Sequence, residues 1–161
     1  LEDKVDICQN AIDMAIALGV ERPKVAILAA VETVTSKMPA TLDAAALCKM
    51  AERGQITGGL LDGPLAFDNA ISKEAARIKG IRSEVAGDPD ILLAPDLEAG
   101  NILAKQLTFL ANADAAGLVL GARVPIILTS RADSQLSRLA SCAVAVLFAA
   151  ARRANASSAI H

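Results

Sequence analysis

Side chains that can do chemistry lie together where a short apolar run meets the start of a long apolar helix pattern. The segment 128–135 reads Leu-Thr-Ser-Arg-Ala-Asp-Ser-Gln, so Ser130, Arg131 and Asp133 bring a hydroxyl, a guanidinium and a carboxylate to one junction. The first turn of a helix also presents free backbone N–H groups, which attract anions. The sequence therefore predicts an anion-binding site in this segment.

The same residues have a second interpretation, because Ser and Asp are preferred at helix beginnings for capping alone. On that interpretation Ser130 and Ser134 accept hydrogen bonds from the first turn of the helix, Asp133 does the same, and Arg131 is solvated. The residue types by themselves leave both interpretations open.

The elements that must position this junction alternate between helix and strand along the chain. Helical periodicity predicts helices over about 5–18, 42–53, 68–79, 97–112 and 135–153. Short apolar runs predict strands over 24–31, 56–61, 90–94, 118–121 and 125–128. Thr41 is the expected cap of the second helix, and residues 155–161 are an expected frayed tail. Continuous apolar strands between helices are typical of an α/β fold, with a largely parallel sheet and helices on both faces.

Composition excludes several classes of function. The chain has 161 residues, 16 basic and 18 acidic, with 2% aromatic residues, and so offers neither the charge nor the stacking surface that nucleic-acid binding needs. The longest apolar stretch, 142–151, is shorter than the roughly 20 residues of a membrane span. We therefore expect a buried helix there and no membrane contact.

The cysteines and the histidine limit the chemistry further. Cys8, Cys48 and Cys142 are widely spaced, which favours reduced core thiols in a cytoplasmic protein over disulfides or a metal site. The single His161 rules out a His-based triad or a His-rich metal site, and we expect no metal. The chain opens on Leu1 in an amphipathic pattern without a signal peptide, as expected for the middle of a longer chain.

Four motifs, in order, resemble one enzyme family over nearly the whole chain. They are Val31-Glu32-Thr33-Val34 with Lys37-Met38-Pro39-Ala40-Thr41, then residues 62–70 (DGPLAFDNA), 95–101 (PDLEAGN) and 129–134 (TSRADS). The chain thereby resembles the C-terminal half of the phosphate acetyltransferase/phosphate butyryltransferase family. The motif variants KMPAT and TSRADS are more similar to those of the butyryltransferase branch.

The resemblance implies a two-domain enzyme of about twice this length, with an isocitrate/isopropylmalate-dehydrogenase-like fold and an active site between the domains. Residues 1–124 would then form the second domain. Residues 125–161 would supply the last strand and helix, which belong with a first domain that is mostly absent from this chain.

The resemblance also implies the reaction and its residues. Such an enzyme moves a short acyl group, acetyl or butyryl, between coenzyme A and inorganic phosphate, both of them substrates, without a permanently bound cofactor. Arg131 would bind phosphate through its planar fork, and Ser130 would donate to the developing oxyanion. The acetyltransferase branch has an Asp six residues after the Arg, where this chain has Ser137, so Asp133 is the nearest candidate for the general base.

Further residues are predicted to bind substrate. Asn101 and Lys105 share one helix face after a strand end, although capping and solvated roles compete. Gly63 and Pro64 belong to an expected tight turn that would line the cleft. Arg138, one turn into the last helix, would assist Arg131.

Alternatives remain in other classes. A phosphotransacetylase-like region of some malic enzymes acts without catalysis, in regulation or oligomerisation, and Ser137 would fit that role. A dehydrogenase of the same fold would need acidic metal ligands that the predicted helices do not supply. We expect a homo-oligomer, a dimer through the apolar face of 97–110, and negligible turnover from these 161 residues alone.

Overall fold

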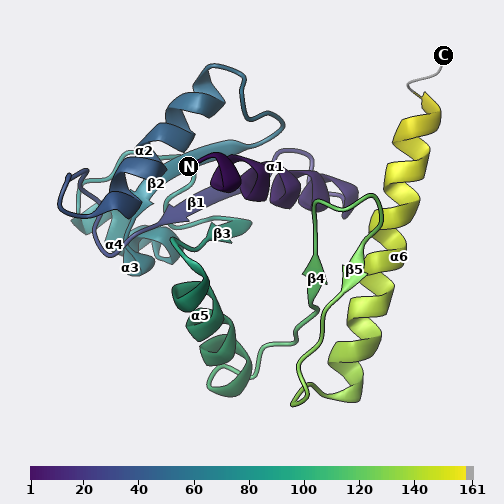
Figure 1. Ribbon diagram of the computed structural model, residues 1–161. Helices are drawn as coiled ribbons and strands as arrows, with labels where there is room; N and C mark the ends of the chain where they lie inside the picture. Colours follow the sequence, from purple (N-terminus) through teal and green to yellow (C-terminus); the bar gives the residue numbers. More distant parts are fainter. Residues whose placement is uncertain (159–161) are drawn as a thin grey trace.

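A three-stranded parallel sheet forms the centre of the protein (Figure 1). The structure is a computed structural model that describes the backbone of residues 1–158 and the side chains of residues 1–154. The strand order is β2-β1-β3, so β1 is the middle strand and both of its neighbours run parallel to it. The three strands are β1 (Lys24–Leu28), β2 (Leu60–Leu65) and β3 (Ile91–Leu93).

Helices cover both faces of this sheet, as the alternating pattern predicted. Successive residues of a strand point to opposite faces, and β1 divides accordingly. Val25 and Ile27 pack with residues of α1 and α2, whereas Ala26 and Leu28 pack with residues of α3 and α4. The helices are α1 (Glu2–Ala17), α2 (Pro39–Glu52), α3 (Phe67–Ile71) and α4 (Lys73–Ile78). The predicted α/β class is confirmed.

The chain beyond the sheet forms two separate arms (Figure 1). One arm is α5 (Leu97–Phe109), none of whose residues is buried. The other consists of a small antiparallel pair, β4 (Leu118–Val119) and β5 (Ile126–Ile127), and the long helix α6 (Gln135–Ser158). The last two predicted strands therefore exist, but they pair with each other and not with the parallel sheet. The domain division at 124/125 falls between these paired strands.

The prediction of a tight turn at Gly63 and Pro64 is wrong, because both residues lie inside β2. The strand predicted over 56–61 is also displaced toward the C-terminus, because β2 begins at Leu60 and continues through Gly63 and Pro64 to Leu65. Ala26 pairs with Asp62 and Leu28 with Leu65, so Ile27 faces two residues, Gly63 and Pro64, across a bulge. The peptide bond between those two residues is cis. A bulge tolerates proline because the residue needs no ladder N–H there.

Two helix boundaries also differ from the prediction. The second helix begins at Pro39, which loses no bond at a first-turn position, and Thr41 is buried inside it. The Thr41 hydroxyl accepts from Thr35 N–H, and its one proton has Met38 O at 2.8 Å and Thr35 O at 3.0 Å as acceptors, so it ties down the preceding loop instead of capping the helix. The helix predicted over 68–79 is two helices, because Ser72 ends α3 and caps α4 through Ala75 N–H at 3.2 Å.

The prediction of a buried helix over 142–151 is wrong. α6 is 24 residues long and extends into the expected tail, and of its side chains up to residue 154 it buries only a narrow stripe of Ser141, Ala145 and Phe148. Cys142 is exposed and not a core residue. Gln135–Ala154 is long and apolar enough to cross a membrane, a test that core helices of soluble proteins also pass, so it is weak evidence. His161 lies outside the described residues.

Candidate functional site

A cavity of about 300 Å³ between the two arms contains four of the residues predicted from separate motifs. Asn101 and Lys105 reach it from α5, and Ser130 and Asp133 reach it from the loop before α6. The remaining wall comes from Thr108 of α5, from Ala104, from residues 115–117 and from Leu128. A hydroxyl, an amide, an ammonium and a carboxylate thus line this cavity, called the polar cavity below, which suits a polar ligand.

The loop before α6 is a closed turn held by three hydrogen bonds. Ser130 N–H donates to Asp133 Oδ2 at 2.6 Å, and Asp133 N–H donates to Ser130 O at 3.1 Å. Ala132 N–H donates to Ser130 Oγ at 3.3 Å. Both Ser130 and Asp133 are half-buried. The Ser130 hydroxyl accepts one bond here, and no described residue receives its proton.

The cap of α6 is Ser134, as the second interpretation of this segment proposed for that residue. Its Oγ accepts from Ser137 N–H at 3.1 Å, and its carbonyl accepts from Arg138 N–H at 3.2 Å. Ser130 and Asp133 do not cap the helix and bond only within the turn. Capping therefore explains Ser134 but leaves Ser130 and Asp133 without a role in the helix.

Ser141 supports this site and was not predicted from the sequence. It is buried in the apolar stripe of α6, accepts from Gly117 N–H at 3.0 Å and donates to Ser137 O at 2.7 Å. Gly117 O in turn accepts from Leu128 N–H at 3.0 Å. The chain of bonds fixes the wall of the cavity to α6. In the sequence, the one feature that could have identified Ser141 is that it is a serine among apolar residues on a helix face.

The two faces of α5 differ in chemistry. Asn101, Lys105 and Thr108 face the polar cavity, and the Lys105 ammonium lies 5.8 Å from the centroid of the Phe109 ring. The other face, with Ile102 and Leu103, lines an apolar cavity of about 360 Å³ at the carboxyl ends of the parallel strands. Ligands of α/β proteins usually bind at such strand ends, but this cavity carries almost no polar group.

The other predicted site residues lie outside the polar cavity. Arg131 and Arg138 are exposed, and among the described residues no side chain or carbonyl is bound to either guanidinium. Gly63 and Pro64 lie in β2 against the core, where a Cβ on Gly63 would meet Ile27. The roles predicted for these four residues stay predictions.

A second polar cluster follows the ends of β1 and β2. Lys79 Nζ lies 3.0 Å from Asp68 Oδ1 and 3.3 Å from Glu32 Oε2. Its hydrogen bond lowers the pKa of Asp68, and that same bond raises the pKa of Lys79. The fully buried Asn69 donates to Glu32 at 3.3 Å, and its Oδ1 has no partner among the described residues. The cluster joins two of the family-like motifs and holds their loops together.

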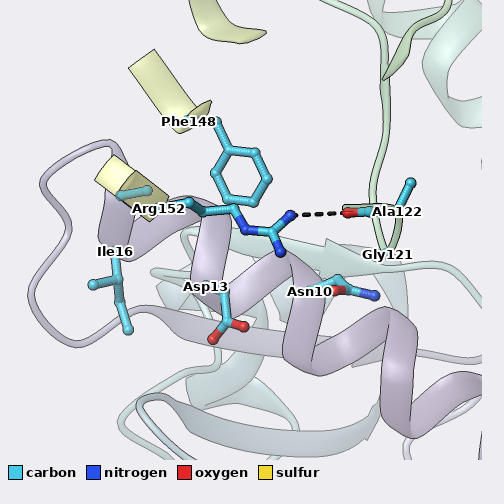
Figure 2. A pocket seen from close by; sticks show the side chains of 8 residues that line it. Asn10, Asp13, Ile16, Gly121, Ala122, Phe148 and Arg152 are labelled. Atoms are coloured by element: carbon cyan, nitrogen blue, oxygen red, sulfur yellow. Dashed lines mark hydrogen bonds between the residues drawn. The ribbon is translucent and has the colours of Figure 1, made fainter. Parts of the chain in front are cut away.

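A further cavity, of about 460 Å³, lies where α6 crosses α1 (Figure 2). Arg152 donates to Ala122 O at 2.8 Å and lies 5.7 Å from the centroid of the Phe148 ring. Asp13 faces the same space from α1. This cavity is larger, but it contains none of the residues that the motifs predicted.

Neither a metal site nor a reactive buried thiol is found among the described residues. Within the described residues, no group of three or more His, Cys, Asp or Glu side chains is arranged to hold a metal ion. The three cysteines are free. Burial raises the pKa of Cys8 to about 11 and that of Cys48 to about 12, so neither is a nucleophile at neutral pH.

Comparisons with known proteins agree with the resemblance seen in the motifs. Residues 1–146 match a family model described as "Phosphate acetyl/butaryl transferase". The chain is 75% identical to a phosphate acetyltransferase of Rhizobium meliloti over 154 residues, covering 96% of this chain and 49% of the relative. It is 50% identical to a phosphate butyryltransferase of Clostridium acetobutylicum over 149 residues, covering 92% of this chain and 50% of that relative.

A solved structure supports the fold. The crystal structure of a branched-chain phosphotransacylase from Enterococcus faecalis superposes with a TM-score of 0.81 at 35% identity, covering 91% of this chain and 52% of that one. The chain thus spans about half the length of the relatives it matches. The higher identity is to the acetyltransferase, so these comparisons do not favour the butyryltransferase branch that the motif wording indicated.

Proposed function

Because this chain belongs to the phosphate acetyl/butyryl transferase family, we propose that it contributes to an enzyme that transfers a short acyl group between coenzyme A and inorganic phosphate. A phosphate oxygen attacks the thioester carbonyl carbon, a tetrahedral oxyanion forms, and the carbon–sulfur bond breaks. The products are an acyl phosphate and the thiol of coenzyme A, which takes up one proton.

The observation that carries this proposal is the polar cavity between the arms. Two motifs that are about thirty residues apart in the chain place Asn101, Lys105, Ser130 and Asp133 around one space. In the proposed reaction the Ser130 hydroxyl donates to the oxyanion, where preorganised donors act most strongly. Lys105 supplies positive charge for phosphate, and Asn101 orients the substrate.

Arg131 is proposed to bind phosphate once the substrates are present. Its guanidinium is next to Ser130 in the chain and is not committed to any described partner. A planar fork can hold two phosphate oxygens at once, which makes Arg better suited than Lys to this role. Arg138 is proposed to add a second positive charge one turn along α6.

The test is phosphate-dependent release of free thiol from acetyl-CoA and butyryl-CoA by the full-length protein that contains these residues. Arg131→Ala should lower kcat/KM by at least about tenfold, since losing a charge-assisted phosphate contact costs about 1.5–3 kcal/mol. Arg82→Ala, which removes an exposed arginine outside the site, is the matched control. A change of less than about twofold in both kcat and KM for Arg131→Ala would remove that residue from the site.

The same assay addresses the non-catalytic alternative. Ser137 stands where the acetyltransferase branch has an Asp, which favours a regulatory or oligomerisation role within a larger enzyme. A full-length protein that contains these residues, is folded and releases no thiol with either acyl-CoA would support that alternative. The relative rates with the two acyl-CoA substrates would give the acyl preference.

We propose further that the chain functions as a dimer. Its accessible surface is 10237 Å², whereas a monomer of 16.5 kDa is expected to expose about 7,600 Å². A standard interface covers only about 800 Å² per partner, so the excess leaves room for such an interface beside the contacts with the missing half. Ile102, Phe109 and Leu110 lie exposed at α5, which makes α5 the proposed interface.

The 161 residues alone are proposed to have negligible turnover, because the polar cavity is open and holding two substrates in register needs an opposing wall. Light scattering and the thiol-release assay on this chain test both statements together. A monodisperse monomer with turnover near that of full-length relatives would contradict them. A cytoplasmic location is proposed because the three cysteines are unpaired, as is usual for cytosolic proteins.

A further inference from the structure

The carboxylate of Asp133 accepts one hydrogen bond in the site, from the N–H of Ser130, and that bond is short. The 2.6 Å distance from Asp133 Oδ2 to Ser130 N is at the short end for a charge-assisted hydrogen bond. The return bond from Asp133 N–H to Ser130 O at 3.1 Å closes the turn. The Asp133 carboxylate therefore holds the N–H of Ser130, and the Asp133 backbone N–H holds the carbonyl of the same residue.

This arrangement leaves the Ser130 hydroxyl as the only free donor of that residue. Its N–H is bound to Asp133, and its Oγ accepts from Ala132 N–H at 3.3 Å. The hydroxyl proton has no acceptor among the described residues, and Ser130 lines the polar cavity. A donor that stabilises an oxyanion must be fixed before the reaction begins, and Asp133 holds the backbone that carries this hydroxyl.

We infer that Asp133 is a positioning residue, whose carboxylate orients Ser130 toward the polar cavity, and that it is not the proton acceptor of the reaction. The expected effect on turnover rests on the proposed function, whereas the effect on the Ser130 backbone does not. It replaces the assignment of Asp133 as general base. Capping of α6 does not compete as an explanation, because Ser134 performs it.

The substitution Asp133→Asn distinguishes a positioning role from a role as proton acceptor. The amide oxygen of Asp133→Asn can accept from Ser130 N–H with the same geometry, but the amide cannot take a proton at neutral pH. Asp133→Ala removes both abilities. Ser134→Ala is the matched control, since it removes the α6 cap next to Asp133 and leaves the Ser130 turn intact.

The experiment measures kcat, KM and the pH profile of thiol release, together with hydrogen–deuterium exchange of the peptide that carries Ser130, all in the full protein. Asp133→Ala should lower kcat by at least about tenfold with a smaller change in KM, and it should add one fast-exchanging amide. Asp133→Asn should restore kcat to within about threefold of the wild type, with the same pH profile and a protected amide. Ser134→Ala should not expose the Ser130 amide.

Two results would overturn the inference. One is that Asp133→Asn is as inactive as Asp133→Ala and loses a limb of the pH profile, which would make Asp133 the base. The other is that the Ser130 amide stays protected in Asp133→Ala. If the wild type itself releases no thiol, the proposed function fails, yet the exchange measurement still decides whether Asp133 fixes Ser130.

Discussion

Gly63 is predicted to be a packing residue, and adding one methyl group to it tests that prediction. A Cβ at this position would lie 2.8 Å from Cβ of Ile27, 2.9 Å from the Ile27 carbonyl oxygen and 3.3 Å from Cβ of Ala44. Favourable contacts between carbon atoms lie at about 3.5–4.0 Å, so Gly63→Ala forces β2 away from its neighbours. Ile27 is in the middle strand and Ala44 is fully buried, so neither can move cheaply.

The cost follows from these contacts. Overpacking a well-packed core costs about 1–3 kcal/mol. Because the nearest atoms belong to a central strand and include a backbone oxygen, we expect the upper half of that range, about 2–3 kcal/mol. The sequence has no Trp and no Tyr, so urea unfolding should be followed by far-UV circular dichroism and not by intrinsic fluorescence.

Gly100→Ala is the matched control, because it makes the same chemical change in the helix α5. There the new Cβ would meet only Cβ of Ala94, at 3.3 Å, and Ala is favoured over Gly in a helix by about 1 kcal/mol. We expect this variant to be neutral or more stable. If Gly63→Ala unfolds within about 0.5 kcal/mol of the wild type, the packing argument is refuted. A stable Gly63→Ala with a raised KM would favour the substrate-binding role instead.

Two other predictions concern buried groups. Ser141→Ala should lower the free energy of unfolding by about 1–3 kcal/mol, because it leaves Gly117 N–H unpaired; an unchanged urea midpoint would contradict this. Native protein at about pH 8 should react with iodoacetamide only at Cys142, since the pKa values of Cys8 and Cys48 are about 11 and about 12. The raised thiol pKa values also mean that stability is full below the unfolded thiol pKa and falls as the pH rises toward 11 to 12. Mass spectrometry of alkylated peptides, and unfolding curves at several alkaline pH values, would check both statements.

The sequence determined the features that a few neighbouring residues encode. Apolar periodicity gave the order of helices and strands. Gly19 ends α1 with a φ of 99°, and the N–H groups of Gly19 and Val20 each donate one bond back to the last turn, as at a glycine stop. Four short motifs in order gave the family before any fold was known. The helices and strands depend on contacts within one turn or one strand, and each motif is a short run of residues, so both can be read from the chain directly.

Local preferences failed where packing overrode them. Asp62-Gly63-Pro64 has the composition of a turn, yet it continues β2 because only a glycine lets that strand approach Ile27. The stretch 142–151 has the composition of a core helix, yet the described residues bury little of α6 up to residue 154. Composition describes what a residue prefers, whereas burial also depends on which other elements reach it.

Only the tertiary structure decided which candidate residues meet. The approach of α5 to the loop before α6 brings Asn101 and Lys105 into one cavity with Ser130 and Asp133, and leaves Arg131 outside it. These residues are some thirty positions apart and meet through the hairpin of β4 and β5, which Ser141 anchors through Gly117. No local pattern encodes how close α5 comes to the loop before α6. The sequence therefore supplied the chemical groups, and long-range packing selected the ones that share a site.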